Sequence, residues 1–224
     1  RDLANIIYGD LKSKEDLIQI KEPYDAVIHL AAIIPPIAYR SESNTYNVNV
    51  RATQNLLDHF ESYCPKAFFM FSSSVAIYGD RLETPEIRVT DSLHHEDKDF
   101  YVQTKIKAEK AVQKSKLQWS IFRLTAILGV NNHKITGLMF HMPLRTPMEI
   151  STPSDAARAF VYGLNYKSQL SKRIFNLGGG ASCRTTYEEL LDKTFKIHGL
   201  GVLNFPKKTF AEKNFHCGHM MDSD

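Results

Sequence analysis

The sequence is poor in cysteine, in long apolar runs and in clustered charge of one sign. Its three cysteines, Cys64, Cys183 and Cys217, are far apart and form no Cys-x-x-Cys pair, which predicts a reduced, cytoplasmic setting. No apolar run approaches the roughly 20 residues of a membrane-spanning helix, so we expect no membrane partner. The net charge of +3 is spread along the chain and forms no basic stripe of the kind that binds nucleic acid.

A glycine-rich phosphate loop is also missing. The usual dinucleotide signature is Gly-x-Gly-x-x-Gly between a strand and a helix. Gly178, Gly179 and Gly180 have that setting, but the last position of the signature is Cys183, so we interpret them as a turn that requires positive φ. His216-Cys217-Gly218-His219 has no second ligand pair at zinc spacing, and we expect no metal.

The chain does contain a regular alternation of apolar strands and amphipathic helices. It predicts parallel βαβ units, and therefore an α/β fold with a Rossmann-type doubly wound parallel sheet and a small C-terminal substrate lobe. Predicted strands cover residues 24–32, 68–74, 119–124 and 173–177, with a further strand end at 6–8; predicted helices cover residues 14–18, 43–63, 100–115, 154–164 and a segment starting near 185.

The chain length suits one domain with a lobe. We expect the dinucleotide-binding domain to comprise residues 1–130 and 151–177. The substrate-binding lobe then comprises residues 131–150, an irregular stretch, and 178–224.

A phenol and an ammonium lie four residues apart at Tyr101 and Lys105. On a helix this spacing places both on one face, where Lys105 would lower the pKa of Tyr101. A serine at the end of the strand over 68–74 could donate a hydrogen bond to the same substrate oxygen, which gives a proton-transfer site for a carbinol or carbonyl carbon. Tyr8 and Lys12 have the same spacing across a Gly-Asp turn, where we interpret it as structural.

Several segments, taken together and in order, resemble the extended short-chain dehydrogenase/reductases of the NAD-dependent epimerase/dehydratase family. The matching segments are Gly9-Asp10-Leu11, residues 25–32 (DAVIHLAA), 49–53 (NVRAT), 71–79 (FSSSVAIYG), Tyr101 with Lys105, 123–129 (RLTAILG), 155–159 and 175–179. The glycine-loop unit that precedes these segments in the family has no counterpart in the 224 residues, so we expect part of the cofactor site to lie outside them.

The resemblance implies residue roles. It implies that Tyr101 is the acid/base, that Lys105 lowers its pKa and holds ribose hydroxyls, that Ser74 binds the reacting oxygen, and that Asn49 helps to position the lysine. The implied cofactor is NAD or NADP, bound by Asp10, Leu11, Leu30, Ala31, Ala32, Ser72, Tyr101, Lys105 and Arg123, and the implied substrate contacts are Ser74, Val75 and Ala126.

Departures from the family pattern narrow the chemistry. Val75 and Ala76 stand where the 4,6-dehydratases have Asp-Glu, and neither can move a proton, so sugar dehydration is disfavoured. Ala126 replaces the asparagine found near the substrate diphosphate in many nucleotide-sugar enzymes, which weakens a galactose-type epimerase interpretation.

The resulting prediction is an NAD(P)-dependent oxidoreductase or epimerase that acts on a sugar nucleotide or a related small molecule. The alternatives are a carbonyl reductase of a non-sugar substrate, a non-catalytic cofactor-sensing relative and an inactive fragment of such an enzyme. For the assembly we consider a homodimer through the helices near 43–63 and 101–115.

Overall fold

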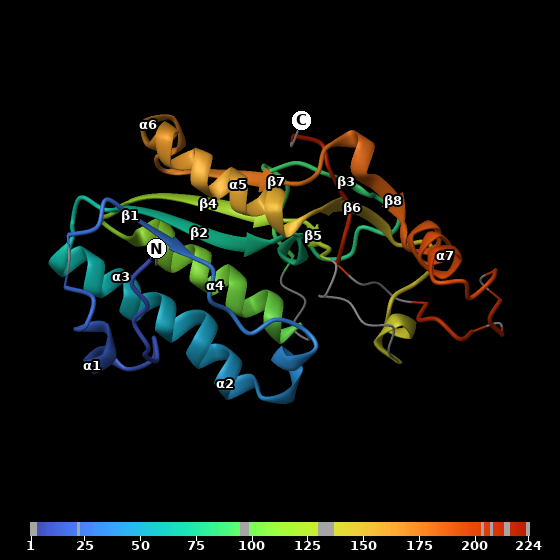
Figure 1. Cartoon of the computed structure of the whole chain (residues 1–224), viewed down its shortest axis with the longest axis horizontal. Helices are drawn as coiled ribbons and strands as arrows, with labels where there is room; N and C mark the ends of the chain where they lie inside the picture. The colour runs from blue at the N-terminus through green and yellow to red at the C-terminus, as the bar shows by residue number, and fades with distance from the viewer. Residues whose placement is uncertain are drawn as a thin grey trace. The chain divides into compact units, whose positions relative to one another are not determined.

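A computed structural model describes residues 4–21, 23–94, 99–129, 137–202, 204–206, 208–212 and 216–222 (Figure 1). The chain divides into two compact units. Unit 1 comprises Arg1–Ser73, Glu96–Ile121 and Gly163–Arg173, and unit 2 comprises Ser74–His95, Phe122–Tyr162 and Ile174–Asp224. The predicted division into a dinucleotide domain and a substrate lobe follows function rather than compactness, and it stays a prediction.

The main sheet has four strands in the order β1-β2-β4-β7. Strands β1 and β2 are parallel, with Ala26 opposite Phe68. The apolar run at the start of β2 is completely buried, as expected for a strand covered on both faces. The predicted α/β Rossmann-type fold is confirmed, and the four predicted strands are observed as β1 Ala26–His29, β2 Phe68–Ser74, β4 Gln118–Leu124 and β7 Arg173–Leu177.

Helices α3 and α4 lie side by side against the β1–β2 part of the sheet (Figure 1). The predicted helix over 43–63 is confirmed, but its central turn, η2, is a π-helix. The short predicted helix near residue 14 is also confirmed, because the Ser13 side chain accepts a hydrogen bond from Asp16 N at 3.1 Å. The helical segments of unit 1 are α1 Lys14–Leu17, η1 Ile37–Arg40, α2 Glu42–Tyr46, η2 Asn47–Arg51, α3 Ala52–Tyr63, α4 Phe100–Lys114, η5 Leu164–Tyr166 and α6 Lys167–Leu170.

Helix α4 begins after Asp99, whose carboxylate accepts a hydrogen bond from Val102 N at 3.1 Å. Three charged residues of α4, Lys107, Glu109 and Lys110, are close in the sequence but do not share a face. The Glu109 side chain is only 1% exposed, whereas both lysines are exposed. Glu109 follows Lys105 by one helical turn, so it shares the buried face of that residue.

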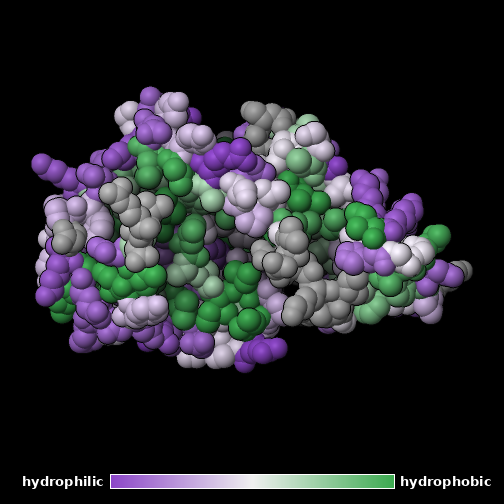
Figure 2. All heavy atoms as spheres, in the orientation of Figure 1, coloured by the Kyte–Doolittle hydropathy of each residue, from purple (hydrophilic) through white to green (hydrophobic). Residues whose placement is uncertain are grey.

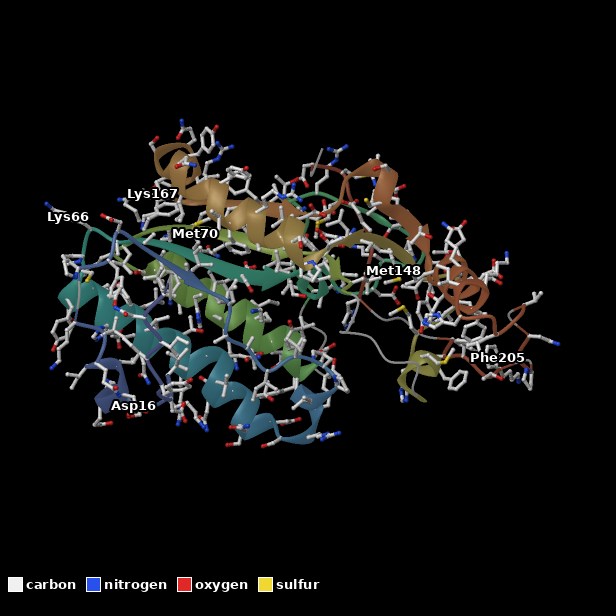
Figure 3. The ribbon with its side chains drawn as sticks, viewed as in Figure 1. Asp16, Lys66, Met70, Met148, Lys167 and Phe205 are labelled. Carbon is white, nitrogen blue, oxygen red and sulfur yellow. The ribbon has the colours of Figure 1, made fainter. Side chains whose placement is uncertain are left out.

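Close packing in unit 1 is found between Met70 of β2 and Gly163. Met70 is labelled in Figure 3 and is completely buried. A Cβ atom on Gly163 would lie 2.8 Å from Met70 Cε, a distance shorter than carbon atoms tolerate. The absence of a side chain at Gly163 therefore allows the backbone to approach Met70.

Unit 2 has a smaller sheet, β5-β6-β8, and a two-stranded parallel pair, β3-β9. Its apolar core surrounds Met148, with Tyr187, Leu191 and Cys217 (Figure 3). Burial raises the pKa of the Cys217 thiol to about 12, so this cysteine belongs to the core. The elements are η3 Val75–Tyr78, β3 Glu86–Ile87, β5 Ala126–Ile127, η4 Gly137–His141, β6 Pro147–Ser151, α5 Pro153–Gly163, η6 Ala181–Cys183, β8 Arg184–Thr186, α7 Tyr187–Ile197 and β9 His219–Met220.

Helix α7 confirms the predicted helix start near residue 185. Thr186 and Glu189 form a reciprocal capping box, in which each side chain accepts a hydrogen bond from the backbone N–H of the other. The turn before it is confirmed too, because Gly180 has φ +79°. A Cβ atom on Gly179 would lie 2.0 Å from the Ile150 carbonyl oxygen, so this turn also requires close backbone approach.

Two expectations about local structure are wrong. Residues 6–8, predicted as a strand end, pair with none of the described strands, and Ile6 is 73% exposed. Residues 147–150, predicted as irregular, belong to β6 (Pro147–Ser151), because β5 and β8 pair with it on either side. In both places tertiary pairing, rather than local pattern, decides whether a strand forms.

Apolar side chains gather on the face of the molecule that Figure 2 draws. Large apolar side chains that are exposed in unit 1, whichever face they lie on, include Ile6 of the N-terminal segment and Leu30 after β1. In the described part of the chain no helix is both long and apolar enough to cross a bilayer.

Candidate active site

Tyr101 and Lys105 both lie on the buried side of α4. Lys105 is 3% exposed; its Nζ donates to the Ser72 carbonyl oxygen at 2.7 Å and lies 4.6 Å from the centre of the Phe71 ring. A direct hydrogen bond therefore joins the predicted catalytic lysine to β2, the strand that ends in three serines.

The burial of Lys105 disfavours its charged form. Burial lowers its pKa from 10.5 to about 8, and the Glu109 carboxylate opposes that change. Burial, with a smaller contribution from the Lys105 charge, lowers the pKa of His29 to about 3. His29 is therefore neutral at physiological pH, and its Nε2 lies 2.9 Å from Thr53 Oγ1.

Asn49 lies in the π-helical turn and joins two segments of unit 1. Its side chain exchanges two hydrogen bonds with the Ile33 backbone, at 2.7 and 2.9 Å, and donates to Thr104 Oγ1 at 3.1 Å. Thr104 in turn donates to the Tyr101 carbonyl oxygen at 2.7 Å. Asn49 thus contacts α4 at the residue before Lys105, and its role in positioning the lysine stays a prediction. Single π-turns occur frequently at functional sites.

Tyr39 was missed by sequence reasoning. Its hydroxyl donates to the Asp99 carboxylate, with oxygen separations of 3.2 and 3.3 Å. Burial, together with Asp99 and a smaller effect of Tyr101, raises the pKa of Tyr39. Tyr39 therefore stays protonated beside the candidate acid/base. The sequence carried no signal for this contact, since the two partners are 60 residues apart.

Ser74 ends β2 and belongs to unit 2. Its Oγ accepts a hydrogen bond from Ala76 N at 3.2 Å and caps η3. Side chains alternate along a strand, so Ser74 and Ser72 share a face, while Ser73 points the other way and its buried Oγ lacks a partner in the described part of the protein. Of the other predicted substrate contacts, Val75 is buried in η3 and Ala126 begins β5.

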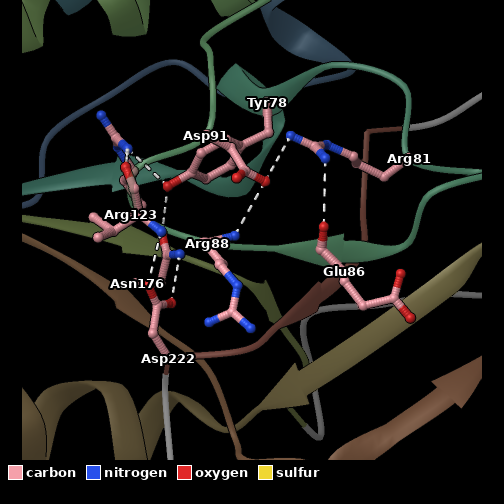
Figure 4. Close-up of polar contacts among 9 residues, drawn as sticks. Tyr78, Arg81, Glu86, Arg88, Asp91, Arg123, Asn176 and Asp222 are labelled. Atoms are coloured by element: carbon pink, nitrogen blue, oxygen red, sulfur yellow. Dashed lines mark hydrogen bonds and ion pairs between the residues drawn. The ribbon is translucent and has the colours of Figure 1, made fainter.

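Arg123, predicted to contact the cofactor, lies in a buried network of unit 2 (Figure 4). Its guanidinium donates to Tyr78 Oη at 2.7 Å and to the Val89 carbonyl oxygen at 3.1 Å. The Tyr78 hydroxyl donates to Asn176 Oδ1 at 2.7 Å, and the Asp222 carboxylate accepts from Asn176 Nδ2 at 2.8 Å and Val89 N at 2.7 Å. Arg123 thus stabilises the fold of unit 2, and its cofactor role stays a prediction.

Glu149 forms the second charged network of unit 2. Its side chain is completely buried and accepts from Gly180 N at 3.1 Å, Arg184 Nε at 3.1 Å and Met220 N at 2.9 Å. One carboxylate thereby joins β6 to the glycine turn, to β8 and to the C-terminal strand β9.

Asp10 and Leu11, both predicted to contact the cofactor, line a hollow of about 260 Å³ in unit 1 together with Ala26 and Val27 of β1. The Asp10 carboxylate accepts a hydrogen bond from Lys12 N at 2.9 Å, and that bond lowers the pKa of Asp10. The remaining predicted cofactor contacts follow β1, where Leu30 and Ala31 are exposed and Ala32 is half-buried.

The second Tyr-x-x-x-Lys match fits its structural interpretation. Tyr8 is 84% exposed, and the ammonium of Lys12 pairs with Asp10 at 3.3 Å on the surface. No helix carries both residues, because residues 8–10 are irregular and Leu11 and Lys12 form a turn.

The profile of the NAD dependent epimerase/dehydratase family matches residues 1–178. The chain belongs to this family. D-Erythronate dehydrogenase of Haemophilus influenzae is 27% identical over 217 residues, and the match covers 86% of this chain and 67% of that protein. The predicted family is therefore confirmed, and the protein is an oxidoreductase of the NAD-dependent epimerase/dehydratase family.

Solved structures share the fold. A short-chain dehydrogenase/reductase superfamily protein of Agrobacterium tumefaciens with bound NAD has a TM-score of 0.76 at 19% identity, over 96% of this chain and 76% of that chain. MoeE5 in complex with UDP-glucose and NAD has a TM-score of 0.74 at 18% identity, over 96% and 73%. Structures of this fold hold NAD or NADPH, and the predicted use of NAD or NADP is confirmed for the family.

The site residues of unit 1 fit a nicotinamide cofactor. An ammonium carries three N–H donors, and within the described part of the chain Lys105 Nζ has one acceptor, the Ser72 carbonyl oxygen. Two donors therefore remain on a buried cation, a state that favours a hydroxyl-bearing ligand such as a ribose. Lys105, Tyr101 and the residues after β1 would hold the cofactor.

Proposed function

We propose that this protein catalyses hydride transfer at a secondary carbinol carbon of a small polyhydroxylated molecule, with NAD or NADP as cofactor. The observation that carries the proposal is the buried pair on α4. Lys105 is a buried cation with donors to spare, and Tyr101 lies one turn before it on the same face. Perturbed ionisable groups of this kind are concentrated at active sites.

In this proposal Tyr101 handles the proton. Its phenolate oxygen accepts the hydroxyl proton of the substrate alcohol during oxidation and returns it during reduction. The ammonium of Lys105 favours the phenolate, and Ser74 donates a hydrogen bond to the substrate oxygen. The nicotinamide, when bound, supplies the hydride acceptor.

Three observations support the proposed substrate class. The relative from Haemophilus influenzae is a dehydrogenase named for a hydroxy acid, and MoeE5 was solved with a nucleotide sugar. Val75 and Ala76 follow Ser74 in η3, and their hydrocarbon side chains disfavour 4,6-dehydration. We therefore favour dehydrogenation of a sugar-derived acid, with epimerisation of a sugar nucleotide as the second candidate.

Two measurements on the complete purified protein test this proposal. The first is NADH or NADPH formation with D-erythronate, related hydroxy acids and UDP-glucose. The second is mass spectrometry of the molecules released on denaturation. Oxidation of a hydroxy acid with an empty site supports a dehydrogenase, whereas tightly held NAD with epimerised product supports an epimerase. Absence of any nicotinamide binding would contradict both.

The homodimer through the helices near 43–63 and 101–115 is also a proposal. Its prediction rests on the prevalence of two-fold dimers, and the exposed positions on these helices are mostly polar, as at Gln54, Asp58, Lys107 and Lys110. Light scattering of the complete protein tests it, and a monomer at all concentrations would contradict it.

A further inference from the structure

Helix α4 carries two buried side chains of opposite charge that are four residues apart. Lys105 is 3% exposed and Glu109, one helical turn later, is 1% exposed. Residues four apart on a helix have Cβ atoms about 5–6 Å apart on the same face. An isolated buried charge is strongly unfavourable, so a buried ion normally has a counter-charge.

Among the described residues, the other groups found in contact with Lys105 or acting on its charge carry no negative charge. His29 on β1 is kept neutral by burial, which lowers its pKa to about 3. Strand β2 contributes the neutral Ser72 carbonyl oxygen and the Phe71 ring. On α4, Tyr101 lies one turn before the lysine and is the group on which the ammonium is proposed to act.

We propose that Glu109 is a positioning residue of the active site, whose buried carboxylate keeps the Lys105 side chain in its ammonium form. This inference rests on the proposed function of Lys105 and adds a residue that touches neither substrate nor cofactor. In this arrangement the Lys105 ammonium favours the phenolate form of Tyr101, and the Glu109 carboxylate balances the charge of that ammonium. The direction of the Glu109 effect on the pKa of Lys105 agrees with this arrangement.

The test is a titration of Lys105 by NMR, in protein labelled at the lysine side chains and assigned with Lys105→Arg. In Glu109→Gln we expect the pKa of Lys105 to fall by about one unit or more, since a nearby opposite charge shifts a pKa by about 1–3 units. Glu109→Asp keeps the carboxylate and should give an intermediate value. Glu42→Gln, at an exposed site in unit 1, is the matched control and should leave it unchanged.

Turnover gives a second readout. Because loss of the ammonium lowers activity as the pH rises, the alkaline limb of the pH profile should move to lower pH in Glu109→Gln and return toward the wild-type position in Glu109→Asp. An unchanged pKa of Lys105 in Glu109→Gln would overturn the inference. Absence of turnover in the wild type would instead count against the proposed function, while the NMR titration would still test Glu109.

A double mutant covers the case in which Glu109→Gln does not fold. If Glu109 acts by balancing the charge of Lys105, Lys105→Met with Glu109→Gln removes both charges and should recover stability relative to either single variant. If the double variant is as unstable as Glu109→Gln alone, the carboxylate serves packing and the inference is wrong. Urea unfolding of the complete protein measures this.

Discussion

Buried charged side chains differ between the two units in how many hydrogen-bond partners they have. In unit 2, Arg123 and Glu149 are buried ions surrounded by protein partners, and each joins several elements. In unit 1, Lys105 is equally buried but has one hydrogen-bond acceptor among the described residues. Buried polar groups are nearly always satisfied. We therefore interpret the ions with several partners as structural, and the buried cation with donors to spare as part of the proposed ligand site.

The largest expected effect tests the assignment of the pair in unit 1. Tyr101→Phe should lower kcat of the complete enzyme about 10²- to 10⁴-fold, because positioned proton transfer contributes about that much. The matched control is Tyr8→Phe, which changes the other Tyr-x-x-x-Lys sequence and should leave kcat unchanged. Steady-state assays measure both, and turnover within a few-fold of wild type in Tyr101→Phe would remove Tyr101 as acid/base.

A large loss of stability is expected when the buried carboxylate of Glu149 in unit 2 is removed. Glu149→Ala leaves three buried or half-buried N–H donors without their acceptor and should lower the free energy of unfolding by about 3–5 kcal/mol. Glu188→Ala, at an exposed site on α7, should change it by less than about 0.5 kcal/mol. Urea unfolding curves measure the difference, and equal losses would break the contrast between the units.

The lowered pKa of Lys105 predicts how the free energy of unfolding depends on pH. Its pKa is about 8 in the folded protein against 10.5 in the unfolded chain. Between these values the unfolded chain holds a proton that the folded protein has released, so raising the pH through this window stabilises the fold by up to about 1.4 kcal/mol per pH unit. Lys105→Met should lack this rise relative to wild type. Urea unfolding at a series of pH values measures this. If the free energy of unfolding of the two proteins changes with pH in the same way, the lowered pKa of Lys105 is contradicted.

A smaller effect is expected for Asn49 of unit 1. Unlike Lys105, its side chain uses both its carbonyl oxygen and its amide group in hydrogen bonds. Asn49→Ala removes three hydrogen bonds and should lower the free energy of unfolding by about 1–3 kcal/mol. Asn55→Ala, on the adjoining helix α3, removes two bonds to the backbone carbonyls of Leu11 and Lys12 nearer the surface and should cost less. A larger loss in Asn55→Ala would show that burial does not set the order.

Local signals predicted the elements that carry the site. The apolar run over 68–74 ends in three hydroxyls, and it is β2 with the predicted bounds. Asp99 caps the helix that follows, and Tyr101 and Lys105 lie on its buried face. These features depend on neighbours within a few residues, so they can be read from the chain itself.

Long-range contacts could not be predicted in this way. Tyr39 bonds to Asp99 across 60 positions, and β6 forms because β5 and β8 pair with it. Glu109 read as a surface residue, since a charged side chain on a helix usually is. The packing of α4 within unit 1 buries it.

The sequence by itself determined the family, the strand–helix alternation and the spacing of Tyr101 and Lys105, because local periodicity and motif order carry that information. The tertiary structure decided which charges are buried and how each is satisfied. Arg123 and Glu149 each have several hydrogen-bond partners in unit 2, while Lys105 in unit 1 has one acceptor among the described residues. The physical reason is that burial and partnership depend on residues distant in the chain, which only packing brings together.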